Sequence, residues 1–206
     1  MEDSKRAKIL DAATKIFAEK GYQYATISEI AKEAGMATGL IYSYFKNKLD
    51  LLLSIVVIFL QNINQLNQER ISPLRDPGDK LHTFLHNCED LLLKDENALC
   101  RVKVLHEALP HIIMIKDKKL QEKRAKIMAA NDQLIATIDE IMISGQKQGV
   151  FDDSLNPKVM RQVLSGAIER AIYGLFFKTY SGEEIGYDRE DAHKAIVRMI
   201  EKFIRR

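Results

Sequence analysis

Apolar positions recur at intervals of three and four residues along most of the chain, which is the spacing of amphipathic α-helices. The first such stripe consists of Ile9, Ala12, Ala13, Ile16 and Phe17. Pro and Gly residues punctuate the pattern, and no alternating run typical of a β-strand stands out. The predicted fold class is all-α, with about nine helices over residues 4–20, 27–34, 38–44, 48–69, 79–94, 98–109, 118–148, 157–179 and 189–204.

Local signals mark several of the predicted helix ends. Thr26 and Glu29 have the spacing of a capping box, in which each side chain satisfies a free amide at a helix start. Gly35 lies where a tight turn needs a positive φ, which glycine adopts at the least cost. Asn156 followed by Pro157 is an N-cap with proline at the first helical position. These signals predict short loops between well-defined helices.

Residues 9–51 have the layout of a helix-turn-helix. A helix and a glycine turn are followed by a short capped helix, a second glycine turn, and a short helix that contains Tyr42 and Tyr44. Ala31 and Ile41 are small and aliphatic where the two short helices should cross, which permits close packing. This layout predicts sequence-specific binding of a recognition helix in the DNA major groove. The competing interpretation is an exposed tyrosine pair on an ordinary bundle helix.

The overall composition limits the classes of protein. The 206 residues are 46% hydrophobic and 29% charged, as in an ordinary soluble globular protein. A net charge of only +2 gives no general preference for nucleic acid, so basic residues must gather on one face. The apolar run from Leu51 to Leu60 is about half of the roughly 20 residues that a membrane-spanning helix needs. We expect reduced thiols at Cys88 and Cys100, and the sequence starts without the apolar segment of a signal peptide. Both features predict a cytoplasmic protein without a membrane partner.

Residues 9–51 resemble the DNA-binding domain of the tetracycline-repressor (TetR) family of bacterial transcription regulators. The matching positions are Ala13, Phe17, Gly21, Tyr22, Thr26, Ile27, Ile30, Ala31, Ala34, Gly35, Ile41, Tyr42, Tyr44, Phe45 and Lys48. The resemblance implies a three-helix DNA-binding domain over residues 1–48 and a helical effector-binding and dimerisation domain over residues 49–206. It also implies a function without catalysis, cofactor or metal.

The resemblance implies a role for each residue of the helix-turn-helix. Thr26 and Ser28 would contact phosphates, while Thr38, Gly39 and Leu40 would face base edges. The remaining predicted contacts, to the sugar-phosphate backbone, are those of Tyr42, Tyr44, Lys46 and Lys48, and Tyr42 could also touch bases. Two positions depart from the family pattern, because Ala37 and Leu40 stand where the family often has hydroxyl residues. Leu40 can pack on a thymine methyl group but cannot hydrogen-bond a base.

The last two predicted helices carry more apolar surface than one chain can cover. Residues 157–179 are apolar on nearly every face, and residues 189–204 have a clean apolar stripe. By the resemblance, these helices would form a four-helix interface between two copies. The predicted interface residues are Val163, Gly166, Ala167, Ile196, Met199, Ile200 and Phe203. A monomer with a central helix over residues 157–179 is the alternative.

The intervening helices would enclose an effector pocket. Polar residues within apolar segments and some of the larger apolar residues are the candidates for ligand contact, namely Phe59, Phe84, Arg101, His106, Met128, Glu169 and Tyr173. Core packing is the simpler interpretation for the apolar members, and Glu169 with Arg170 could instead form a structural ion pair. The richness in Leu, Ile, Met and Phe favours a large apolar effector such as an acyl-CoA.

The resulting hypothesis is a homodimeric repressor that binds a palindromic operator and is released by an apolar small-molecule effector. The effector would shift the helix over residues 48–69 and change the spacing of the two recognition helices. Control of a drug-efflux or aromatic-compound operon is an alternative with the same fold, as is a DNA-bound regulator without an effector. A helical metalloenzyme is the alternative from another class, but only one Glu-x-x-His motif, Glu190 to His193, is present where a di-iron site needs two.

Overall fold

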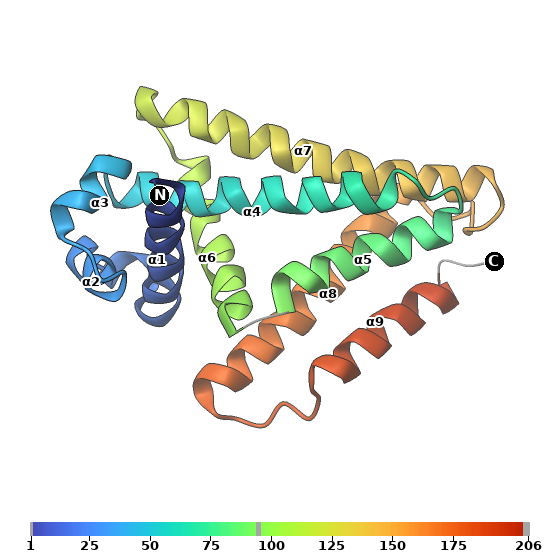
Figure 1. The fold of residues 1–206 in the computed structure, drawn as a ribbon. Coiled ribbons are helices and arrows are strands. Elements are labelled where there is room, and N and C mark those ends of the chain that lie inside the picture. Colours follow the sequence, from blue (N-terminus) through green and yellow to red (C-terminus); the bar gives the residue numbers. More distant parts are fainter. Residues whose placement is uncertain (1, 94–95, 204–206) are drawn as a thin grey trace. The chain divides into compact units, whose positions relative to one another are not determined.

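The regular elements are all α-helices in the part of the chain that a computed structural model describes, residues 2–93 and 96–203. They are drawn in Figure 1. In order they are α1 (Glu2–Tyr24), α2 (Ile27–Glu33), α3 (Thr38–Tyr44), α4 (Lys48–Ile71), α5 (Pro77–Leu93), α6 (Glu96–Ile113), α7 (Lys118–Lys147), α8 (Pro157–Ser181) and α9 (Arg189–Phe203). The predicted all-α fold class is confirmed.

The helices form two compact units, which share the long helices α4 and α7. Unit 1 comprises Met1–Gln61 and Asp95–Ala130, and unit 2 comprises Asn62–Lys94 and Asn131–Arg206. The predicted functional boundary between residues 48 and 49 lies inside unit 1. The division into a DNA-binding and an effector-binding domain therefore stays a prediction.

The core of unit 1 is built on the apolar stripe of α1. Ile9, Ala13 and Phe17 are completely buried, and α1 packs against α2 and α6. Ala31 and Ile41 are buried where α2 and α3 pack against each other, as their size predicts. Burial of large apolar side chains is the main stabilising contribution to such a core. It also fixes the short helices α2 and α3, which are too short to be stable alone.

Two details of α1 and α6 differ from the sequence prediction. The ends of α1 reach Glu2 and Tyr24, but Gly21 interrupts the helix with φ 77° and ψ 153°. The predicted end of α6 at residue 109 is wrong, because the helix continues through Pro110 to Ile113. Proline removes one backbone donor, and here the helix runs for less than one further turn beyond it.

Unit 2 has its own core, formed by parts of α4, α5, α7 and α8 and by the loop between α7 and α8. Its buried members are Ile71, Leu81, Phe84, Leu85, Ile138, Ile141, Met142, Phe151, Met160 and Leu164. The predicted cap is present at the start of α8, where the Asn156 side chain accepts hydrogen bonds from the Lys158 and Val159 amides. After Gly182 the chain reverses, so that α9 runs back along α8 (Figure 1).

The helix α4 is long and apolar enough to cross a membrane, by length and composition alone. However, 56% of its most apolar window is buried inside the protein, and Leu51, Leu52 and Leu53 are fully buried. A helix in the core of a protein passes the same test of length and composition, and the burial of α4 is typical of such a helix.

Candidate DNA-binding interface

The capping box predicted at the start of α2 is present. The Thr26 hydroxyl oxygen accepts a hydrogen bond from the Glu29 amide, and the Glu29 carboxylate accepts from the Thr26 amide at 3.0 Å. Lys20 adds an ion pair to the same carboxylate at 2.5 Å. Hydrogen bonds from Lys20 and then from Thr26 lower the pKa of Glu29 to about 2. The Thr26 side chain is thus already engaged in the local structure, and its predicted phosphate contact stays a prediction.

The turn between α2 and α3 follows the sequence signals. Gly35 has φ 66°, a value that side chains with a Cβ adopt only at a cost. Ala37 occupies the N-cap of α3 without a side-chain hydrogen bond, which is the departure noted in the sequence. The N-cap therefore contributes little to the stability of α3. Instead, α3 is held in place by the buried side chain of Ile41 and by the corner that follows the helix.

Most of the predicted base-contacting and phosphate-contacting residues are exposed. Thr38 and Gly39 are exposed at the start of α3, Leu40 is half-buried, and Tyr42 exposes 54% of its surface. Ser28 and Lys46 are also exposed, whereas Tyr44 is half-buried beside Phe45. Ser43 is an exposed residue of α3 that the sequence analysis missed, and its hydroxyl donates to the Leu40 carbonyl. One face of α3 is therefore available to a partner.

Lys48 makes contacts inside unit 1 that the sequence did not predict. Its ammonium group donates to the carbonyls of Gln23 and Ala25 at 3.0 and 2.9 Å and lies 4.7 Å from the centre of the Tyr22 ring. These contacts tie the start of α4 to the end of α1. Lys48 has a structural role on this geometry, and its predicted phosphate contact stays a prediction.

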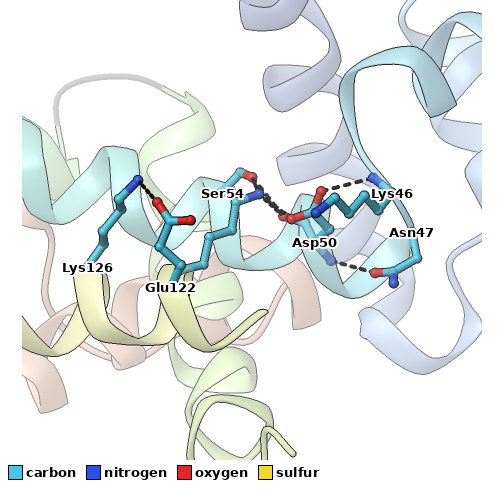
Figure 2. Close-up of polar contacts among 7 residues, drawn as sticks. Lys46, Asn47, Asp50, Ser54, Glu122 and Lys126 are labelled. Atoms are coloured by element: carbon cyan, nitrogen blue, oxygen red, sulfur yellow. Dashed lines mark hydrogen bonds and ion pairs between the residues drawn. The ribbon is translucent and has the colours of Figure 1, made fainter. Parts of the chain in front are cut away.

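The corner between α3 and α4 is held by a network centred on Asp50, shown in Figure 2. The Asp50 amide donates to the Asn47 side chain at 2.8 Å, and one Asp50 carboxylate oxygen accepts from the Lys46 amide at 2.9 Å. The Asn-x-x-Asp spacing is a local capping signal that a closer reading of the sequence would have found. The network fixes the chain that leaves the recognition helix.

A lysine from α7 completes this network. The Lys123 ammonium group bonds to the other Asp50 carboxylate oxygen, to the Asp50 carbonyl at 3.1 Å and to the Ser54 hydroxyl at 2.6 Å. Its nitrogen also lies 5.9 Å from the centre of the Phe45 ring, at the C-cap of α3. Lys123 is 73 residues away from Asp50 in the sequence, so no local pattern could have indicated the pair.

The predicted ligand-binding residues are distributed over both units. Phe59, Arg101, His106 and Met128 belong to unit 1, and Phe84, Glu169 and Tyr173 belong to unit 2. His106, Met128, Glu169 and Tyr173 are exposed, Phe59 and Arg101 are half-buried, and Phe84 lies in the core of unit 2. The seven residues do not all meet within either unit, and their role stays a prediction.

A groove in unit 2 lies between α8, the following loop and α9. Its volume is about 680 Å³, and it is lined by Ala167, Arg170, Ala171, Gly186, Tyr187, Asp191, Ala192, Ala195 and Ile196. None of the seven predicted ligand residues lines it, but two predicted dimer residues, Ala167 and Ile196, do. Small side chains along both helices leave this groove open to close approach by another surface.

One face of α8 carries several exposed apolar residues, together with the exposed Arg170. Val159, Val163, Tyr173 and Phe177 expose between 43% and 61% of their surfaces, and Gly166 is exposed between them. Their spacing of three, four and seven residues places them on one side of the helix. Three further predicted dimer residues, Met199, Ile200 and Phe203, are not among the residues whose side chains the structure describes.

Two family models together match nearly the whole chain. Residues 9–55 match the model described as bacterial regulatory proteins of the tetR family, and residues 45–200 match that of the C-terminal region of YsiA-like proteins. The chain belongs to the TetR family. The predictions of a helix-turn-helix fold and of a ligand-responsive transcription regulator are confirmed.

Relatives of this TetR-family regulator resemble it over nearly its whole length. The fatty acid metabolism regulator protein of Bacillus subtilis is 30% identical over 82% of this chain and 81% of its own. The fatty acid degradation regulator FadR of Bacillus halodurans is 25% identical, with a TM-score of 0.73 over 96% of this chain and 95% of its own. FadR of Bacillus subtilis, solved in complex with stearoyl-CoA, is 26% identical, with a TM-score of 0.69 over 95% and 97%.

Proposed function

We propose that this TetR-family regulator is a cytoplasmic homodimeric repressor that binds a palindromic operator and is released by a long-chain acyl-CoA. The observation that carries the proposal is the similarity over 95% of the chain to FadR of Bacillus subtilis, whose structure contains stearoyl-CoA. The similarity extends beyond the helix-turn-helix, because residues 45–200 also match a family model.

The proposed DNA contact uses the exposed face of α3. Thr38, Gly39 and Tyr42 are the exposed residues that would face the major groove, with Leu40 packing on a thymine methyl group. Ser28 and Lys46 are exposed beside this face and would contact phosphates. The buried corner at Asp50 supports the assignment, because a recognition helix must be held rigidly to read base edges.

The proposed dimer uses the exposed face of α8 and the adjacent groove. Val163 and Gly166 lie on the exposed apolar stripe, and Ala167 and Ile196 line the groove beside it. Exposed apolar residues gathered on one helix face indicate an interaction site. Arg170 lies among them, 5.6 Å from the centre of the Tyr173 ring, and adds one charge to this face. A two-fold symmetric partner fits best, because a palindromic operator needs two recognition helices about 34 to 36 Å apart.

Dimerisation is tested by placing a charge on the stripe. Val163→Asp buries an unpaired carboxylate in the proposed interface and should convert the dimer to monomer in analytical ultracentrifugation at micromolar concentration. Ile143→Asp is the matched control, since Ile143 is an exposed apolar residue of α7 and should leave the dimer intact. A monomeric wild-type protein, or a dimer that persists in Val163→Asp, contradicts the proposed interface.

Operator binding is tested by selecting bound duplexes from a random-sequence pool at two salt concentrations. A palindromic motif that survives the higher salt supports the proposal, because non-specific binding falls steeply with salt. Tyr42→Ala should abolish binding to the selected duplex, while Leu155→Ala, at an exposed apolar residue between α7 and α8, should not. Recovery of duplexes without a shared motif, or wild-type affinity in Tyr42→Ala, contradicts this placement of α3.

The effector class is tested with acyl-CoA thioesters of increasing chain length. Stearoyl-CoA should raise the melting temperature and release the selected duplex, because a ligand stabilises the state that it binds. Octanoyl-CoA and free coenzyme A should do so weakly or not at all, since each buried methylene adds about 0.8 kcal/mol. If instead aromatic or cationic drug-like compounds release the duplex and stearoyl-CoA does not, control of a drug-efflux or aromatic-compound operon replaces the acyl-CoA assignment.

A further inference from the structure

The break in α1 at Gly21 separates backbone groups that would be hydrogen-bonded partners in a regular helix. In an uninterrupted α-helix, the Tyr22 amide would donate to the Ala18 carbonyl four residues earlier. With φ 77° and ψ 153°, Gly21 turns the chain so that this bond cannot form. A short final turn follows, in which the Ala25 amide donates to the Gly21 carbonyl at 3.1 Å. Buried or partly buried backbone groups of this kind require other partners.

The helix α6 supplies a partner to each of these groups. The Glu107 carboxylate accepts a hydrogen bond from the Tyr22 amide at 2.8 Å. The Lys103 ammonium group donates to the Ala18 carbonyl at 2.5 Å. The two side chains are four residues apart on one face of α6, with 4.0 Å between the ammonium nitrogen and the nearer carboxylate oxygen. An ion pair therefore bridges the interrupted hydrogen bond.

The same face of α6 reaches the start of α4 through Tyr22. His111, four residues after Glu107, lies with its ring centre 4.5 Å from that of Tyr22. Lys48, the first residue of α4, lies 4.7 Å from the centre of the same ring and donates to the Gln23 and Ala25 carbonyls. The last turn of α1 therefore links α6 to the residue that follows the corner after the recognition helix.

We propose that Lys103 and Glu107 are positioning residues for operator binding, which hold the last turn of α1 at a fixed angle and thereby fix the start of α4. Without the pair, the Tyr22 amide and the Ala18 carbonyl lose their partners, and the last turn is free to rotate about Gly21. Such a rotation moves the carbonyls that hold Lys48. The inference rests on the proposed operator binding, but it does not depend on which effector the protein binds.

The first test compares two substitutions of Glu107 by their affinity for the selected operator duplex. Glu107→Ala removes the acceptor for the Tyr22 amide and should weaken operator binding about tenfold or more, since hydrogen bonds to charged groups are strong. Glu107→Gln keeps an acceptor oxygen of the same reach and should stay within about threefold of the wild type. Both variants are measured at a temperature where circular dichroism shows them fully folded.

The sign of the effect separates positioning from simple electrostatics. Removing a carboxylate makes the protein more positive, so electrostatics alone would strengthen binding to DNA. The control Glu122→Ala removes an exposed carboxylate of α7 that pairs with Lys126, and it should leave the affinity unchanged or raise it slightly. Wild-type affinity in Glu107→Ala, or an equal loss in the folded Glu107→Gln variant, would overturn the proposal.

A second measurement needs neither DNA nor a variant. In the wild-type protein, the Tyr22 amide should exchange its hydrogen about a hundredfold or more slowly than in an unstructured peptide, because Glu107 holds it. Exchange of the Tyr22 amide at the unprotected rate would overturn the inference even if operator binding is confirmed. Protection of Tyr22 together with failure to select any operator would instead contradict the proposed function and leave the contact with α6 established.

Discussion

Substitution of Lys123 by methionine tests whether α7 holds the corner after the recognition helix. Methionine keeps most of the length and apolar stem of lysine but removes the charge and all three donors. The Lys123 ammonium group bonds to a carboxylate oxygen of Asp50, to its carbonyl and to the Ser54 hydroxyl. The Asp50 side chain is only 8% exposed, so its carboxylate would be left charged and poorly solvated.

The expected loss of stability follows from these contacts. Breaking a fully buried ion pair by removing one partner costs about 3–5 kcal/mol. The Lys123 side chain is 28% exposed, and Asp50 keeps the hydrogen bond from the Lys46 amide at 2.9 Å. Both features reduce the cost, and we expect Lys123→Met to lower the free energy of unfolding by about 2–3 kcal/mol.

Urea unfolding at a fixed protomer concentration measures this loss, because the stability of a dimer depends on concentration. Lys126→Met is the matched control, since Lys126 lies almost one turn further along α7 in an exposed pair with Glu122 and should cost less than about 0.5 kcal/mol. The double variant Lys123→Met, Asp50→Asn removes the unpaired charge and should recover about 1–2 kcal/mol. A Lys123→Met variant that is no less stable than Lys126→Met would refute the reasoning.

Two further predictions concern packing and pH. Gly145→Ala should lower the free energy of unfolding in urea by about 1–3 kcal/mol, because an added Cβ would lie 2.0 Å from a ring carbon of the buried Phe151. In the control Gly39→Ala, nothing lies within 4 Å of the added atom, and the substitution should cost no stability. Equal stabilities of the two variants would contradict this prediction. For Glu29, the pKa is lowered from 4.5 to about 2, so its contribution to stability is complete above pH 4.5 and is lost as the pH falls towards 2. The difference in unfolding free energy between wild type and Glu29→Gln should therefore be constant above pH 4.5 and shrink below it. A difference that stays constant down to pH 2 would show that Lys20 and Thr26 do not bind the Glu29 carboxylate as the structure has it.

Local features of the fold could be predicted from the sequence because neighbouring residues determine them. The capping box of Thr26 and Glu29 needs only a spacing of three residues, and the positive φ of Gly35 needs only the absence of a Cβ. Burial of Ala31 and Ile41 likewise followed from the helical period and from side-chain size. Together these signals were enough to predict the helix-turn-helix and the family.

The contacts that position the recognition helix were decided only by the tertiary structure. Asp50 and Lys123 are 73 residues apart, and Tyr22 and Glu107 are 85 residues apart. Each of these residues has a charged or polar group that would suit an exposed helix face equally well, so the helical period cannot distinguish a surface charge from a partner in an ion pair. Lys48 shows the same limit, because its position beside the recognition helix suggested a phosphate contact, whereas the fold directs its ammonium group to the carbonyls at the end of α1.

The sequence by itself determined which helices form and which of their faces are apolar, because those properties depend on residues within a few turns of one another. Packing of distant helices determined which charges meet, because only the folded chain brings them within bonding distance.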